Sequence, residues 1–93
     1  MNLNDKQITR LRMIGYPIVT EKNQRVSDAI QWFRDEKGIL CTVDMEYYDG
    51  IHYFGVFMGI GLKDGGGTEE FNNFPEAESA LLDALLIYLE VKQ

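Results

Sequence analysis

Apolar residues recur every three or four positions in three stretches of the chain, and this spacing predicts three amphipathic helices. The first helix is expected over residues 5–14, because Asn4 and Gln7 have the spacing of a capping box and Gly15 is placed to end the helix in a left-handed conformation. The YPIVT segment, residues 16–20, follows as a short strand or an ordered crossing segment, since its proline keeps the preceding residue extended.

A second helix is expected after the polar residues 21–25, with Ser27 as its cap and Gly38 closing it. Four residues at helical spacing form its apolar stripe: Val26, Ala29, Ile30 and Phe33. This stripe predicts one helix face that packs on a core.

The last helix is expected to begin behind a capping box formed by Asn73 and Glu76, with Pro75 in its first turn, and to run to about Val91. Its apolar arc is wider than one sheet face can cover. We therefore expect either the first helix or a second copy of the chain to pack on the remainder.

Between the second and third helices, two runs of alternating residues flank Asp49-Gly50, a dipeptide typical of a two-residue type I′ turn. With that turn Tyr48 faces Ile51, and every other opposed pair follows from this one. The register predicts a buried face that collects Ile39, Cys41, Val43, Met45 and Tyr47 against Ile60, Met58, Val56, Phe54 and His52.

The opposite face of the predicted hairpin combines glycines with aromatic residues, which creates shallow hollows flanked by large rings. Either another segment of the same chain packs there, or the face docks another molecule. Together with surplus apolar residues of the last helix, it forms the candidate interaction surface: Tyr48, Tyr53, Gly55, Phe57, Gly59, Leu82, Leu86 and Leu89.

A glycine-rich turn at residues 64–67 follows the hairpin, and residues 68–71 are expected to return as a short third strand. The predicted fold is therefore α+β: a helix, then helix, β-hairpin, third strand and helix, with an antiparallel sheet carrying helices on one face. The 93 residues are expected to form a single domain, with an N-terminal helix and extended segment over 1–25 and an α-β-β-(β)-α core over 26–93.

The net charge of −6 is unevenly distributed. Residues 1–38 carry seven Lys/Arg and five Asp/Glu, whereas residues 39–93 carry two basic and ten acidic side chains. A strongly acidic half repels phosphate, which argues against nucleic acid lying across it. No apolar run is long enough for a membrane span and the N-terminus lacks the apolar stretch of a signal peptide, so we expect a cytoplasmic protein.

The sequence contains no motif specific for catalysis, a metal, a cofactor or a small molecule. Cys41 and His52 are the only thiol and imidazole, and the predicted register separates them by roughly 20 Å, which excludes a nucleophilic pair. The glycine-rich turn lacks the spacing of a phosphate-binding loop, and Asp44 and Glu46 have the pattern of solvated strand residues. We therefore expect that the protein is not an enzyme.

One concentration of basic residues lies near the N-terminus: Lys6, Arg10, Arg12, Lys22 and Arg25. Two of them, Lys6 and Arg10, are an i, i+4 pair on the predicted first helix and form a small positive face. All five are candidate phosphate contacts in an alternative function, nucleic-acid binding.

From residue 26 onward, the order helix, strand, strand, strand, helix, with an alanine-rich final helix, resembles the topology of a double-stranded RNA-binding domain. That family begins its last helix with a basic cluster, whereas the matching positions here are Pro75, Glu76 and Glu78, so the resemblance implies a fold and not RNA binding through that helix. The stretches VSDAIQWFRDEKG and FPEAESALLDALLIYLE, with the hairpin, are also similar to small proteins of phages and mobile elements in gut bacteria, a resemblance that implies no particular activity.

We therefore expect a non-catalytic, intracellular interaction or accessory module whose partner is another protein or a second copy of itself. The alternative is a nucleic-acid-binding protein that uses the basic N-terminal segment on a fold like that of a double-stranded RNA-binding domain. No cofactor, membrane or small-molecule partner is implied.

Overall fold

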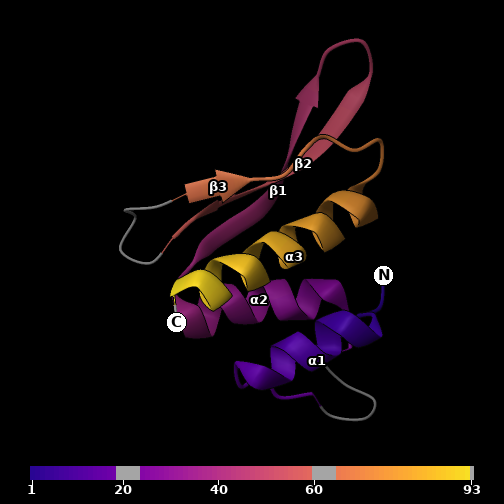
Figure 1. The fold of residues 1–93 in the computed structure, drawn as a ribbon. Coiled ribbons are helices and arrows are strands. Elements are labelled where there is room, and N and C mark those ends of the chain that lie inside the picture. Colours follow the sequence, from indigo (N-terminus) through magenta and orange to yellow (C-terminus); the bar gives the residue numbers. More distant parts are fainter. Residues whose placement is uncertain (19–23, 60–64, 93) are drawn as a thin grey trace.

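The structure is a computed structural model that describes residues 1–18, 24–59 and 65–92. Within these residues it contains three helices and a three-stranded antiparallel sheet, which confirms the predicted α+β class. Figure 1 shows α3 and α2 on one side of the sheet, with α1 farthest from it. The elements are α1 (Asp5–Met13), α2 (Val26–Lys37), β1 (Leu40–Tyr47), β2 (Ile51–Met58), β3 (Gly65–Gly67) and α3 (Phe74–Lys92).

Helix α1 begins where the sequence predicts and ends one residue earlier, at Met13. The Gln7 N–H donates to Asn4 Oδ1 over 2.8 Å, and the Asn4 N–H donates to Gln7 Oε1 over 3.0 Å, so the predicted capping box is present. Gly15 adopts a φ of 91°, the left-handed conformation expected after the helix.

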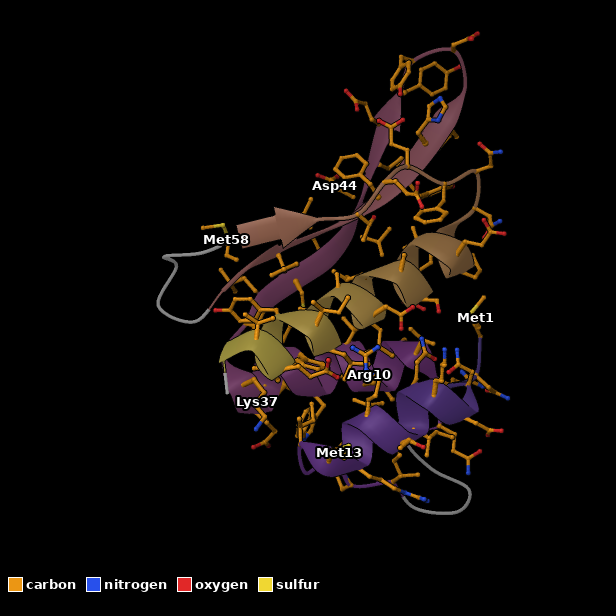
Figure 2. All side chains as sticks on the ribbon, viewed as in Figure 1. Met1, Arg10, Met13, Lys37, Asp44 and Met58 are labelled. Carbon is orange, nitrogen blue, oxygen red and sulfur yellow. The ribbon has the colours of Figure 1, made fainter. Side chains whose placement is uncertain are left out.

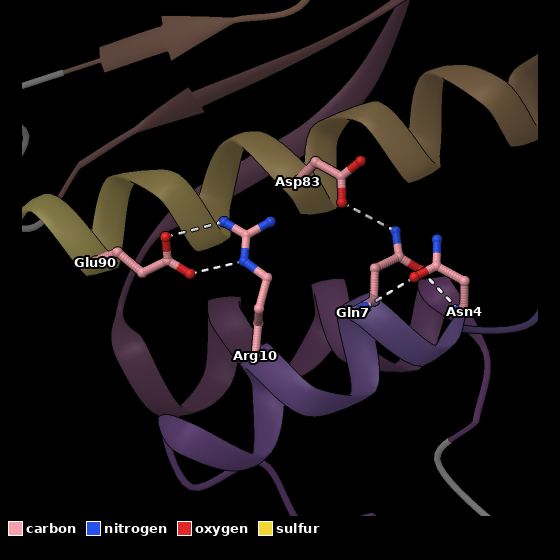
Figure 3. A network of polar contacts seen from close by, with 5 residues as sticks. All are labelled: Asn4, Gln7, Arg10, Asp83 and Glu90. Atoms are coloured by element: carbon pink, nitrogen blue, oxygen red, sulfur yellow. Dashed lines mark hydrogen bonds and ion pairs between the residues drawn. The ribbon is translucent and has the colours of Figure 1, made fainter.

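The same glutamine joins α1 to α3. Gln7 is only 2% exposed, and its side-chain amide donates to Ser79 Oγ and to Asp83 Oδ1, each over 3.1 Å. Figure 3 shows Gln7 between its cap partner Asn4 and the Asp83 carboxylate. One side chain therefore satisfies a helix terminus and fixes how two helices dock.

Helix α2 buries the predicted apolar stripe: Val26, Ala29, Ile30 and Phe33. Gly38 ends it with a φ of 66°. The prediction that Ser27 caps this helix is wrong, because the helix already begins at Val26 with Arg25 as its N-cap. Its start is fixed by the N-terminus, since the Val26 N–H donates to the Met1 carbonyl over 3.0 Å.

The YPIVT segment lies partly outside the described residues. Residues 16–18 form no strand, because the Ile18 N–H donates to the nearby Tyr16 carbonyl over 3.0 Å in a tight local turn. Strand-like pairing near the N-terminus comes instead from an antiparallel bridge between Asn2 and Arg25.

The predicted hairpin register is wrong by one residue. Tyr47, not Tyr48, lies opposite Ile51, and three residues connect the strands. Asp49 has a φ of 48° and Gly50 a φ of 109°, so the Asp-Gly dipeptide supplies the last two positions of a longer loop. The shift turns every side chain of β2 to the other side of the sheet relative to the prediction.

Packing against α3 explains the observed register. An added Cβ at Gly55 would lie 2.6 Å from Leu81 Cβ, and Gly59 lies against the Tyr88 ring in the same way. The missing side chains therefore let α3 approach the sheet closely. We call the side of the sheet covered by α3 the helix face and the other side the open face; Cys41, Val43, Gly55 and Phe57 belong to the helix face.

Helix α3 begins at the predicted place, where the Glu76 N–H donates to Asn73 Oδ1 over 2.9 Å. It packs on the sheet with one side and on α2 and α1 with the other, which accounts for its wide apolar arc within one chain. Leu82, Leu86 and Leu89 are 0%, 1% and 3% exposed, so the prediction that they belong to an interaction surface is not compatible with this packing. Of the helices in the described ranges, none combines the length and the apolar character needed to span a membrane.

The third strand lies at Gly65–Gly67, earlier than the predicted residues 68–71. The ladder breaks at Thr68 because its hydroxyl, and not a carbonyl, accepts the Gly55 N–H over 2.8 Å. Pairing resumes only as an isolated bridge between Phe71 and Tyr53. The predicted turn at residues 64–67 therefore falls partly within β3 and partly outside the described residues.

Candidate functional site

The outer half of the hairpin, residues 44–54, projects beyond the helices (Figure 1), and we call it the arm. Helix α3 contacts the helix face of the arm near its base, where the Phe74 ring packs against Tyr53. Four large side chains there and at the tip stay exposed: Met45 (59%), Tyr47 (80%), Tyr48 (49%) and Ile51 (44%). The arm thus presents apolar surface that the described part of the chain leaves uncovered.

Contacts with the segment before α3 hold the tip of the arm. The Tyr48 and His52 rings stack with centroids 4.4 Å apart, and the Tyr48 hydroxyl donates to the Glu70 carboxylate. His52 Nδ1 lies 3.7 Å from that carboxylate, and the hydrogen bond from Tyr48 to Glu70 raises the pKa of Tyr48. These contacts therefore hold the tip of the arm against the segment that precedes α3.

A groove of about 570 Å³ lies on the open face, at the end of the sheet opposite the arm. It is apolar because β1 and β2 contribute Leu40, Thr42, Val56 and Met58, while β3 contributes glycines without side chains. Figure 2 labels Met58 at this end and Asp44 toward the arm. Leu40 and Met58, directly opposed, are 59% and 43% exposed.

The surface around the arm and the groove is acidic. No lysine or arginine occurs between residues 40 and 59 or between 65 and 75, whereas Asp44, Glu46 and Glu70 are exposed beside the apolar side chains. Among the residues that the structure describes, Arg34 of α2 is the one basic side chain that lines the groove, and it donates to the Cys41 carbonyl over 3.0 Å.

The predicted interaction surface is only partly presented. Gly55 and Gly59 are buried against α3, and the Phe57 ring contacts Tyr88 with centroids 5.5 Å apart. Tyr53 is half-buried beneath Phe74, whereas Tyr48 is exposed at the tip of the arm. The prediction therefore named the covered side of β2.

The sequence prediction missed the residues that are presented: Leu40, Met45, Tyr47, Ile51 and Met58. The predicted buried face included Met45, Tyr47 and Met58. The wrong register accounts for Met58, whereas Met45 and Tyr47 keep their predicted face and are exposed because the arm extends beyond the helices. A shift by one residue exchanges buried for presented side chains on one strand.

The basic candidates lie on the opposite side of the molecule. Lys6, Arg10 and Arg12 are on α1 and Arg25 precedes α2, while Lys22 lies outside the described residues. The Arg10 guanidinium makes two hydrogen bonds to Glu90 of α3, over 2.7 and 3.0 Å (Figure 3), which raise the pKa of Arg10. Arg10 is thus occupied within the chain, and phosphate binding by this group stays a prediction.

Cys41 and His52 do not form a nucleophilic pair. Cys41 lies opposite Phe57 and His52 lies opposite Glu46, on different faces and roughly 17 Å apart along the strands. Burial raises the pKa of the Cys41 thiol to about 11. In the described ranges, no three His, Cys, Asp or Glu side chains gather closely enough to hold a metal ion.

Neither protein-family models, nor curated proteins, nor solved structures match this chain. The resemblances to a double-stranded RNA-binding domain and to phage and mobile-element proteins therefore stay predictions.

Proposed function

We propose that this protein is a non-catalytic binding module whose partner is another protein, and that the partner contacts the arm and the open face. The observation that carries the proposal is the exposure of large apolar side chains on a braced projection. Met45 and Tyr47 of the arm are exposed although the same chain buries a continuous core of leucines elsewhere. Exposed apolar patches of this kind are typical of protein interaction sites.

The charge around this surface favours a basic partner. Asp44 and Glu46 lie between the apolar side chains of β1, and no lysine or arginine of β1 or β2 offsets them. A partner with Lys or Arg around an apolar anchor would gain both attraction and burial. A second copy of this chain would bring carboxylates against carboxylates.

We infer a reducing, cytoplasmic setting for this binding. Cys41 is the only cysteine of the sequence and is a buried free thiol, so the fold uses no disulfide.

Selection of peptides from a random library displayed on phage tests the proposal. Peptides recovered on the full chain should be enriched in Lys and Arg together with apolar residues. Their binding should fall on the double variant Met45→Ser, Tyr47→Ser and persist on the control Met13→Ser, an exposed position on α1 (81%). Recovered peptides that bind the double variant as well as the parent, or that show no basic excess, would contradict the proposal.

A further inference from the structure

The outer edge of β1 has a defined set of outward-pointing backbone groups. On β2, the Tyr53 N–H and carbonyl bond to Phe71, and the Gly55 N–H and carbonyl bond to Thr68, so both residues direct their backbone groups away from β1. Their opposed residues, Met45 and Val43, form the non-hydrogen-bonded pairs of the antiparallel ladder. The backbone groups of Val43 and Met45 therefore point away from β2, to the outer edge of the sheet.

Within the described ranges, the chain covers only one end of this edge. The Arg34 side chain of α2 donates to the Cys41 carbonyl over 3.0 Å. Farther along, the Met45 N–H donates to the carboxylate of its neighbour Asp44 over 2.8 Å, so this outward N–H is satisfied locally. Among the residues that the structure describes, the Val43 N–H and the Met45 carbonyl have no hydrogen-bond partner.

We propose that this edge, residues 43–47, binds an extended segment of the partner as a fourth strand, and that the segment carries Lys or Arg at alternate positions with apolar residues between them. This inference rests on the proposed function and names the binding mode and the chemistry of the partner. Strand addition supplies affinity through main-chain hydrogen bonds, and alternate side chains supply specificity.

The side chains of β1 determine the sequence of the incoming strand. Asp44 and Glu46 point to the open face, and the residues of a neighbouring strand on that face lie directly or diagonally beside them. Val43, Met45 and Tyr47 point to the other face and take apolar neighbours. When a carbonyl of the incoming segment accepts the Met45 N–H, the Asp44 carboxylate loses its hydrogen bond to that N–H and pairs with a basic side chain of the segment.

The same geometry disfavours a second copy of β1 as the added strand. In two-fold antiparallel pairing centred on residue 43, 44 or 45, Asp44 lies directly or diagonally across from its own copy. Like charges at these positions repel. An alternating basic segment replaces that repulsion by attraction.

Hydrogen exchange of the full chain, followed by NMR at low ionic strength, tests the inference. The probe is a seven-residue peptide in which lysine alternates with valine, and the control peptide has the same composition with its lysines in one block. The alternating peptide should slow exchange of the Val43 and Tyr47 amides and bind about tenfold more tightly than the block peptide. Slowed exchange of Val43 that depends on protein concentration without peptide would identify a second copy as the occupant and overturn the inference.

Three variants separate this mode from binding in general. Val43→Pro removes the outward N–H without removing a ladder hydrogen bond, and should abolish binding of the alternating peptide, whereas Val43→Thr keeps the N–H and should bind normally. The double variant Asp44→Lys, Glu46→Lys, at exposed positions, should reverse the preference toward a peptide that alternates glutamate with valine. If Val43→Pro does not fold, this reversal of peptide preference by the double variant tests strand addition in its place.

The experiments distinguish a failure of strand addition from a failure of the proposed function. Binding of phage-selected peptides that depends on Met45 and Tyr47, without protection of the Val43 amide or reversal by Asp44→Lys, Glu46→Lys, would overturn strand addition and leave the proposed function intact. Absence of binding by both the selected and the alternating peptides would overturn both.

Discussion

Gly55 of β2 lies directly against Leu81 of α3, where an added methyl group would meet Leu81 Cβ at 2.6 Å and Leu81 Cα at 3.2 Å. The contact joins the centre of the sheet to the centre of the longest helix. It fixes which side of β2 is covered, and hence which side chains of the hairpin are presented to solvent.

Gly55→Ala should destabilise the fold by about 1–3 kcal/mol, the usual cost of overpacking, because both Leu81 atoms are fixed to the helix backbone. Gly59→Ala is the matched comparison. It meets the Tyr88 ring, whose far end can move aside, so its loss should be smaller. Urea unfolding measures both free energies, and equal stability of the Gly55 variant and the parent would contradict the packing.

Gln7→Ala should lower the free energy of unfolding by about 2 kcal/mol, because it removes the bond from the Asn4 N–H to Gln7 Oε1 and two hydrogen bonds to α3. Lys6→Ala, at an exposed position of the same helix, should stay within about 0.5 kcal/mol of the parent. Thermal or urea unfolding compares the two variants. Similar losses for both would show that α1 does not dock through Gln7.

Glu90→Gln should reduce stability slightly at neutral pH and have no effect in acid. The hydrogen bond from Arg10 lowers the pKa of Glu90 from its ordinary value of 4.5. A lowered carboxyl pKa stabilises the fold fully above the unfolded pKa, and this stabilisation is lost as the pH falls through the folded pKa. Unfolding midpoints of parent and variant should therefore differ at pH 7 and converge near pH 3. A constant difference would contradict the ion pair, and added salt should shrink the difference at pH 7.

The Cys41 thiol should react slowly with a disulfide reagent at pH 8, since burial raises its pKa from 9.0 to about 11 and few thiolates form. In urea the reaction should reach the rate of a free cysteine. Because the folded pKa is raised, this group also costs stability as the pH rises above about 9 toward 11. Fast labelling of the folded chain would contradict the burial of β1 against α2.

Local signals in the sequence predicted the helices well. Asn4, Asn73 and Gly38 act through neighbouring backbone groups, so their roles follow from spacing alone. The start of α2 was missed because it depends on pairing between Asn2 and Arg25, which are distant in the sequence.

The hairpin register could not be predicted from its turn. Asp49-Gly50 suits a two-residue turn and also the end of a three-residue loop, since both place residues at positive φ. Contact with α3 decides between them, because Gly55 and Gly59 must lie beneath Leu81 and Tyr88. The face that each β2 side chain takes follows from that long-range contact, whereas Met45 and Tyr47 of β1 are exposed because the arm projects beyond the helices.

The pairing of β1 with β2 decides which side chains a partner can reach, and nuclear Overhauser effects between Hα protons of opposed residues measure this pairing most directly. Strong effects should join Met45 to Tyr53 and Val43 to Gly55, the non-hydrogen-bonded pairs. Strong effects from Met45 to Phe54 instead would place Met45 and Phe54 on the same face and contradict the proposed binding surface.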